Sequence, residues 1–259
     1  MLGVLAGFCA LMGLAIGSFL NVVIYRVPRK MSVVSPRSAC PNCKTPIADR
    51  DNVPVVSWLL LKGRCRTCGN PISPRYPLVE ASTSVLFAGM ALRFGYSWAL
   101  PAYLVLIAGL FALAMIDLDV RLLPKRIVYP LLAMVAALLV VASAATDHWR
   151  SLWIAAICSV AWFALFFLIN LASAKLLGFG DVRLALVLGL GLGWLGVSEV
   201  IIGFFAANLF GAAVGIALIA ARKAQRDTPI PYGVFLALGA AFAIYFGPAL
   251  HLHLRLRGA

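Results

Sequence analysis

The stretch WALPAYLVLIAGLFALAMID at residues 98–117 is an apolar run that carries no charge before its last residue, Asp117. A helix of this length rises about 30 Å, which matches the hydrocarbon thickness of a bilayer. Similar runs recur along the chain, which is 63% hydrophobic and only 12% charged. The pattern predicts an all-α, polytopic membrane protein.

We expect about eight transmembrane helices. They are predicted at residues 2–25, 77–94, 98–117, 126–146, 151–173, 182–197, 199–222 and 231–250. The first segment lacks a basic start and is longer than the core of a signal peptide, so we expect it to be retained. Taken together, the segments are rich in Gly and Ala, which favours close helix packing in lipid.

The net charge of +13 is unevenly distributed. Ten Lys and Arg residues lie in segment 26–76, and most of the others lie in loops that the helix count places on the same side. Because cytoplasmic loops of membrane proteins are rich in Lys and Arg, this side is predicted to be cytoplasmic. The charge therefore indicates topology and contact with anionic lipid headgroups, and we expect no nucleic-acid partner.

Two matched octets, CPNCKTPI at 40–47 and CRTCGNPI at 65–72, lie within this basic segment. Each contains the C-x2-C spacing with which two thiolates bind one Zn²⁺, and two pairs complete a tetrahedron. The alternative is two disulfides, which would need an oxidising compartment. We therefore predict a first transmembrane helix at 1–25, a zinc-binding module at 26–76 and a multi-helix membrane domain at 77–259. The predicted zinc ligands are Cys40, Cys43, Cys65 and Cys68.

Three acidic residues lie at the boundaries of predicted membrane helices. Asp117 and Asp119 end the third segment, and Asp181 precedes the sixth. Carboxylates at bilayer depth are costly and usually functional. Two that meet could share a proton, so that one activates water while the other polarises a peptide carbonyl, as in aspartic proteases. The alternative is two unrelated aspartates that pair with Arg121 and Arg183.

Asp117 is expected to be deeper than Asp119, since it follows the apolar run directly. Gly178 and Gly180 precede Asp181 in the motif GFGD, and without side chains they would let a substrate backbone approach the carboxylate. Glu80, at the start of the second segment, either interacts with a helix dipole or lines a polar cleft. No histidine is predicted near these residues, which argues against a Ser-His-Asp site.

In their order along the chain, these motifs resemble those of the type IV prepilin peptidases, a family of GxGD membrane aspartyl proteases. The similar elements are GSFLNVVIYRVP at 17–28, the paired cysteine motifs, SPRYPLVE at 73–80, Asp117 upstream of Pro124, GFGD at 178–181, and PIPYGVFLALG at 229–239. Lys125 and Val234 depart from the family pattern, which leaves substrate preference open.

The resemblance implies cleavage of the basic leader of prepilins and pseudopilins, which serve type IV pili and type II secretion. The site is implied to lie at the cytoplasmic face of the bacterial inner membrane, with Asp117 and Asp181 as the catalytic pair. Members with the cysteine module also N-methylate the new amino terminus with S-adenosylmethionine. Gly178, Gly180 and Glu80 are implied to contact substrate or cofactor, Glu80 at the methyl-transfer site. The alternatives are a peptidase-only GxGD protease and a non-enzymatic zinc-containing membrane scaffold.

Overall fold

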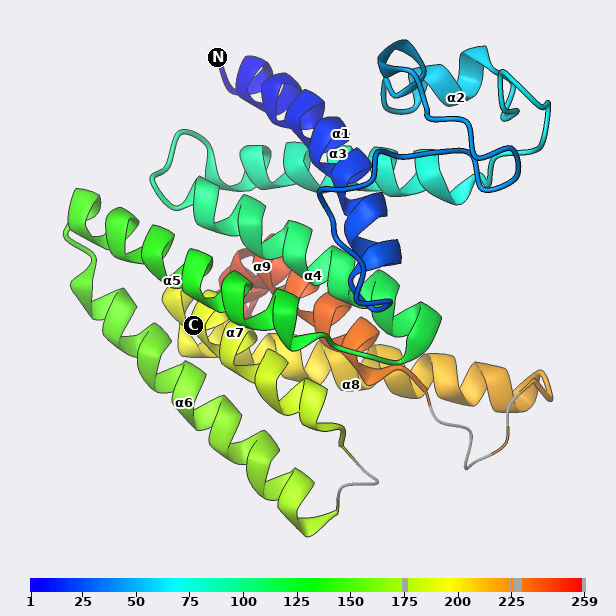
Figure 1. Ribbon diagram of the computed structural model, residues 1–259. Coiled ribbons are helices and arrows are strands. Elements are labelled where there is room, and N and C mark those ends of the chain that lie inside the picture. The colour runs from blue at the N-terminus through cyan, green and yellow to red at the C-terminus, as the bar shows by residue number, and fades with distance from the viewer. Residues whose placement is uncertain (174–176, 224, 226–229, 258–259) are drawn as a thin grey trace. The chain divides into compact units, whose positions relative to one another are not determined.

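The computed structural model describes residues 1–173, 177–223, 225 and 230–257, and it confirms the all-α fold (Figure 1). Within these ranges the only β-structure is two isolated bridges. All eight predicted segments fall on long helices. These are α1 (Leu2–Arg26), α3 (Arg75–Phe94), α4 (Leu100–Val120), α5 (Lys125–Thr146), α6 (Trp149–Ala172), α7 (Phe179–Leu195), α8 (Val197–Ala220) and α9 (Tyr232–Arg257). The short helices η1 (Asp49–Asp51) and α2 (Val56–Leu60) lie between α1 and α3.

Five of the described helices, α1, α4, α5, α6 and α8, are long and apolar enough to cross a membrane. The apolar part of α9 is shorter and covers Tyr232–Gly247. Charged side chains interrupt α3, which contains Glu80, and α7, which contains Asp181 and Arg183. The chain is therefore a multi-pass membrane protein, and the count of eight spans stays a prediction.

The chain forms two compact units, Met1–Tyr96 and Ser97–Ala259. In the first unit, glycines let α1 and α3 approach closely as an antiparallel pair. A Cβ on Gly13 would lie 2.7 Å from the Cα of Ser84, and a Cβ on Gly17 would lie 2.7 Å from the Cα of Glu80. Because the two glycines are four residues apart, they form the small-residue stripe that is typical of close helix contacts in membranes.

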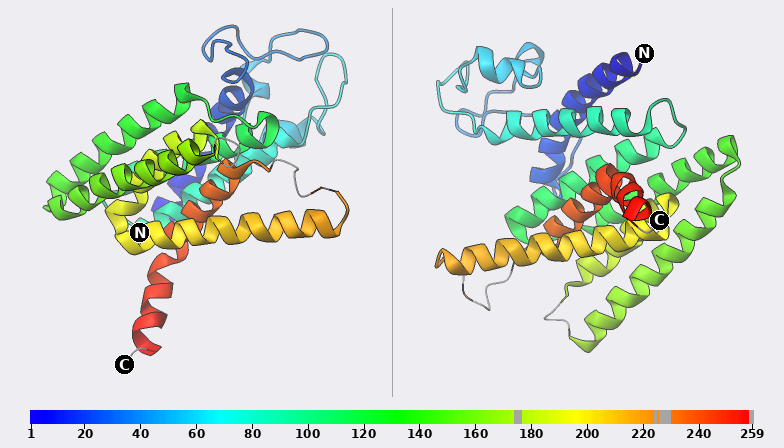
Figure 2. Two further views of the ribbon diagram at one scale, coloured as in Figure 1. Left: turned by 90° about the horizontal axis from the view of Figure 1, so that it is seen from below. Right: turned by 180° about the vertical axis from the view of Figure 1, so that it is seen from behind.

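In the second unit, α7 is the central helix and packs against α5, α6, α8 and α9. Figure 2 shows this unit from two further sides, with α6 against α7 and α8 against α9. Gly189 and Gly193 face α6, where a Cβ would lie 2.6 Å and 2.7 Å from atoms of Cys158. The hydroxyl of Tyr103 in α4 donates a hydrogen bond of 2.7 Å to the carbonyl of Gly191.

Candidate functional site

Asp117 lies in the last turn of α4, with only 5% of its surface exposed. Asp119, two residues further along, is exposed. A helix turns by about 200° over two residues, so the two side chains point in opposite directions. The structure therefore buries Asp117 and leaves Asp119 at the surface of this unit, as the apolar run before Asp117 predicted.

Asp181 lies in the first turn of α7, directly after the glycines of the GFGD motif. Gly178 is the N-cap residue of the helix, and the backbone N–H of Asp181 donates to its carbonyl at 3.0 Å. A Cβ on Gly178 would lie 3.2 Å from Oδ2 of Asp181, which is tighter than ordinary van der Waals contact. Leu123, three residues after the end of α4, lies 3.0 Å from the position of a Cβ on Gly180, next to Asp181. The end of α4 and the start of α7, which carry the two predicted carboxyl groups, therefore lie close to one another.

The start of α9 completes this group of residues. A Cβ on Gly233 would lie 2.9 Å from Oδ2 of Asp117, and this buried oxygen has no hydrogen-bond partner among the described residues. Leu123 packs beside both glycines: a Cβ on Gly180 would lie 3.0 Å from its Cβ, and one on Gly233 would lie 3.1 Å from its Cδ1. Sequence analysis did not assign Leu123 or Gly233 to the site. Leu123 lies between Asp117 and Pro124, and Gly233 lies in the motif at 229–239. Their place in these family motifs was the only sequence feature that could have indicated a role at the site.

Direct ion pairs do not account for the two aspartates. Among the described residues, neither Asp117 nor Asp181 forms a salt bridge with Arg121 or Arg183. Arg121 acts on Asp117 through electrostatics without direct contact. The guanidinium of Arg183 lies 4.8 Å from the centre of the Phe179 ring, and its Nε has no described hydrogen-bond partner. An unpartnered buried oxygen beside a second carboxyl group is an arrangement in which one proton can be shared.

The four cysteines of the first unit converge on one point. Their Sγ atoms all lie within 4.8 Å of one another, with Cys40 and Cys68 separated by 3.8 Å and Cys43 and Cys65 by 4.0 Å. A tetrahedral Zn²⁺ with Zn–S bonds of about 2.3 Å needs sulfur atoms about 3.8 Å apart. A disulfide needs about 2.05 Å. The cluster therefore has the dimensions of a metal site.

The matched octets fold as matched hairpins. In the first, the N–H of Cys40 donates to the carbonyl of Thr45, and the N–H of Lys44 donates to the carbonyl of Cys40, both at 3.0 Å. The second repeats both bonds from Cys65, at 2.8 Å and 2.9 Å. Lys44 and Gly69 occupy equivalent turn positions, with φ of 59° and 71°. Each hairpin therefore presents its two thiols to the same side.

The hairpin also favours the metal-binding form of a thiol. Hydrogen bonds from the side chain and backbone of Thr45 lower the pKa of Cys43 to about 6. Hydrogen bonds from the backbone of Cys68 and Thr67 lower the pKa of Cys65 as well. Since the thiolate is the form that binds metals, one thiol in each hairpin is shifted toward the metal-binding form.

Glu80 lies in the second turn of α3 and is 8% exposed. Because α3 begins at Arg75, Glu80 is not in the first turn, where a dipole interaction would be strongest. Its Oε2 accepts a hydrogen bond of 2.7 Å from the N–H of Val55. Val55 has φ of +61°, a strained conformation for a β-branched residue. The carboxylate of Glu80 thus holds the strained turn that leads into α2.

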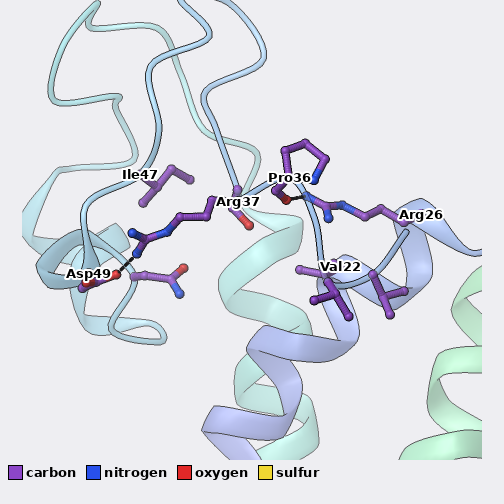
Figure 3. A pocket seen from close by; sticks show the side chains of 10 residues that line it. Val22, Arg26, Pro36, Arg37, Ile47 and Asp49 are labelled. Carbon is purple, nitrogen blue, oxygen red and sulfur yellow. Dashed lines mark hydrogen bonds and ion pairs between the residues drawn. The ribbon is translucent and has the colours of Figure 1, made fainter. Parts of the chain in front are cut away.

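A small pocket lies where α1 passes into the module (Figure 3). Arg26 spans it, and its Nη1 and Nη2 donate to the carbonyls of Ser32 at 2.9 Å and Pro36 at 2.7 Å. Arg37 and Asp49, which also line it, form an ion pair. These charged side chains are partnered within the protein, so they fix the loop after α1.

Residues 11–94 match the family model of the Bacterial Peptidase A24 N-terminal domain, and residues 104–216 match that of the Type IV leader peptidase family. A prepilin leader peptidase/N-methyltransferase of Stutzerimonas stutzeri is 35% identical over 266 residues, which cover 92% of this chain and 90% of that protein. The chain belongs to the type IV leader peptidase family. The resemblance inferred from the ordered motifs is therefore confirmed.

Other relatives of this leader peptidase chain carry the same name. The protein of Aeromonas hydrophila is 36% identical over 271 residues, covering 93% of this chain and 90% of that protein. The protein of Myxococcus xanthus is 40% identical over 218 residues, covering 83% of this chain and 64% of that protein. No solved structure is significantly similar to the chain. The two family matches fall in the two compact units, one in each.

Proposed function

We propose that this leader peptidase cleaves the basic leader of type IV prepilins or pseudopilins and N-methylates the new amino terminus. The observation that carries the proposal is the proximity of Asp117 and Asp181 at helix ends in one unit. The site faces the cytoplasm at the bacterial inner membrane, because the basic residues concentrate on that side of the chain. A prepilin whose apolar helix stays in the bilayer would present its scissile bond at the cytoplasmic boundary of the membrane, where this site is proposed to lie.

Cleavage proceeds by an aspartic-protease mechanism. One carboxylate takes a proton from water, whose oxygen attacks the scissile carbonyl carbon, while the other carboxyl group donates its proton to the carbonyl oxygen. The C–N bond breaks when the leaving amine gains a proton. In this proposal the buried carboxyl group of Asp117, which lies against Gly233 at the start of α9, is one of the two groups that exchange the proton. Gly178 leaves room for an extended substrate backbone beside Asp181, whereas Gly180 lets Leu123 pack closely against the start of α7.

The cysteine module is a structural zinc site, since four thiolates fill the tetrahedral coordination of the metal and leave no open position. Cys40, Cys43, Cys65 and Cys68 are the ligands. When bound, S-adenosylmethionine supplies an electrophilic methyl group for transfer to the new terminal amine. Glu80 serves the methyl-transfer site in this proposal, because a buried carboxylate can accept the proton that the ammonium must lose before nitrogen reacts.

The test uses the purified full chain in detergent with a prepilin substrate and mass spectrometry of the product amino terminus. Asp117→Asn and Asp181→Asn should each lower cleavage by about 10²–10⁴-fold, because an amide neither takes nor shares the proton. Asp119→Asn is the matched control and should keep substantial activity. Both catalytic variants should still methylate a precleaved substrate. An active Asp117→Asn protein beside an inactive Asp119→Asn protein would show that the wrong carboxyl group was chosen.

A further inference from the structure

Residues 53–60 of the cysteine module present an apolar surface that nothing in their own unit covers. The exposed side chains of this segment are Val53 at 47%, Val56 at 49%, Leu59 at 61% and Leu60 at 77%. Trp58 points the other way, and its Nε1 donates to the carbonyl of Ile72 at 3.1 Å. The segment is therefore two-sided: one side holds the module together, and the other offers four aliphatic side chains to the surroundings.

The anchor of this segment lies beside the apolar part of α1. The N–H of Val55 bonds to the carboxylate of Glu80, and the Cα of Glu80 packs against Gly17 of α1. Gly17 precedes Tyr25, the last residue before the basic end of α1, by about 12 Å of helix rise. Since α1 has the length and apolarity of a membrane span, Val55 lies at a level within that span and not beyond its end.

The charges around the segment are positive. Segment 26–76 contains ten Lys and Arg but only two acidic residues, Asp49 and Asp51. Both acidic residues are paired, Asp49 with Arg37 and Asp51 with Arg66. Lys62 and Arg64 follow Leu60 closely and are exposed. Aliphatic side chains next to unopposed basic residues are typical of segments that lie in the interface of an anionic membrane.

We propose that residues 53–60 insert their exposed aliphatic side chains into the interfacial layer of the bilayer, with Lys62 and Arg64 on anionic lipid headgroups. The segment holds the cysteine module against the membrane surface through α2, in addition to its covalent links to α1 and α3. Three observations support the lipid bilayer as the partner of this surface. They are the position of Val55 alongside the apolar part of α1, the continuous aliphatic face, and the excess of basic residues. The inference depends on α1 spanning the membrane and not on either enzymatic activity.

The test places a photo-crosslinking amino acid at Leu60 in the full chain, reconstituted in vesicles of phosphatidylcholine with phosphatidylglycerol. Mass spectrometry should find lipid adducts at position 60. The same label at Thr67, an exposed residue between two cysteines of the second hairpin, is the matched control and should give several-fold fewer adducts. Adducts to a second copy of the chain, adducts to an added prepilin, or equal lipid yields at both positions would overturn the proposal.

A second comparison tests the headgroup contact. In the chain labelled at position 60, Lys62→Gln with Arg64→Gln should lower the lipid-adduct yield several-fold in vesicles that contain phosphatidylglycerol. In vesicles of phosphatidylcholine alone, the substitutions should leave the yield unchanged. Circular dichroism establishes that the doubly substituted chain keeps its helices. An unchanged yield in the anionic vesicles would contradict the role of the two basic side chains.

Discussion

The cysteine module and the aspartate site are built in opposite ways. Each cysteine hairpin is closed by hydrogen bonds between residues a few positions apart, such as that from Cys40 to Thr45. The aspartate site joins Asp117, Asp181 and Gly233, which come from three helices and are separated by more than fifty residues at each step. The comparison shows that a local pattern can encode a complete metal site, whereas the carboxyl pair depends on the packing of a whole helical unit.

Loss of one thiolate should disrupt the whole metal site. Cys43→Ser should lower the bound zinc about tenfold or more, because metal binding is coupled to local folding and three ligands leave the tetrahedron incomplete. Cleavage should fall less than methylation, since the aspartates lie in the other unit. Elemental analysis of protein purified under reducing conditions measures the metal. Wild-type protein that contains no zinc would contradict the first half of the comparison, because the local cysteine pattern would then not encode a metal site.

Gly233→Ala tests the dependence of the aspartate site on packing. The added Cβ would lie 2.9 Å from Oδ2 of Asp117, so we expect cleavage to fall about 10–100-fold as the carboxyl group is displaced. Gly211→Ala is the matched control, because its Cβ would meet Phe235 at an ordinary 3.5 Å. Prepilin cleavage and zinc content are measured for both. Wild-type cleavage by Gly233→Ala would show that α9 is not needed at the site.

The two sites also differ in how much of each could be predicted from the sequence. The octets were recognised together with their metal geometry, because the backbone hydrogen bonds that close each hairpin join residues of the same octet. The eight apolar segments were found for the same reason, and the apolar run before Asp117 distinguished it from Asp119. The contact between Gly233 and Asp117 was not found, because it depends on how α9 packs against α4, and the family motif at 229–239 did not single out Gly233.

The strained backbone conformation of Val55 could not be predicted from the sequence for a similar reason. Its positive φ occurs together with the hydrogen bond from its N–H to Glu80, which is 25 residues away in the sequence. A valine in a loop carries no sign of such a conformation. The position of Glu80 in α3 was misjudged because the helix begins at Arg75, two residues before the predicted start, which moves Glu80 out of the first turn.

Gly17→Ala should have a smaller effect, on stability. The new Cβ would lie 2.7 Å from the Cα of Glu80, so α1 and α3 must separate, at a cost of about 1–3 kcal/mol. Gly7→Ala is the control, because nothing lies within 4 Å of its Cβ and alanine favours a helix. Thermal unfolding in detergent compares the two. Equal midpoints would show that the glycine stripe does not set the spacing of this pair.

The smallest effect concerns the exposed ion pair of the module. A hydrogen bond from Arg66, followed by smaller electrostatic contributions, lowers the pKa of Asp51. A lowered carboxyl pKa stabilises the fold above the unfolded value of about 3.9, and this contribution is lost as the pH falls through the folded pKa. Arg66→Gln should therefore lower the unfolding midpoint slightly at pH 7, and the difference from wild type should shrink under acid conditions. A difference that grows on acidification would contradict this sign.

The antiparallel pairing of α1 and α3 also determines an order of events during biosynthesis. The glycine face of α1 leaves the ribosome before the module, and its partner α3 follows only after about fifty further residues, a delay of several seconds at about 5–20 residues per second. The first hairpin can close early in that interval, because its bonds need no residue outside its own octet, whereas the second octet is complete only at Ile72, eight residues before Glu80. The hydrogen bond from the N–H of Val55 to Glu80 can therefore form only after both octets have been synthesised, and it links the module to the pair of α1 and α3.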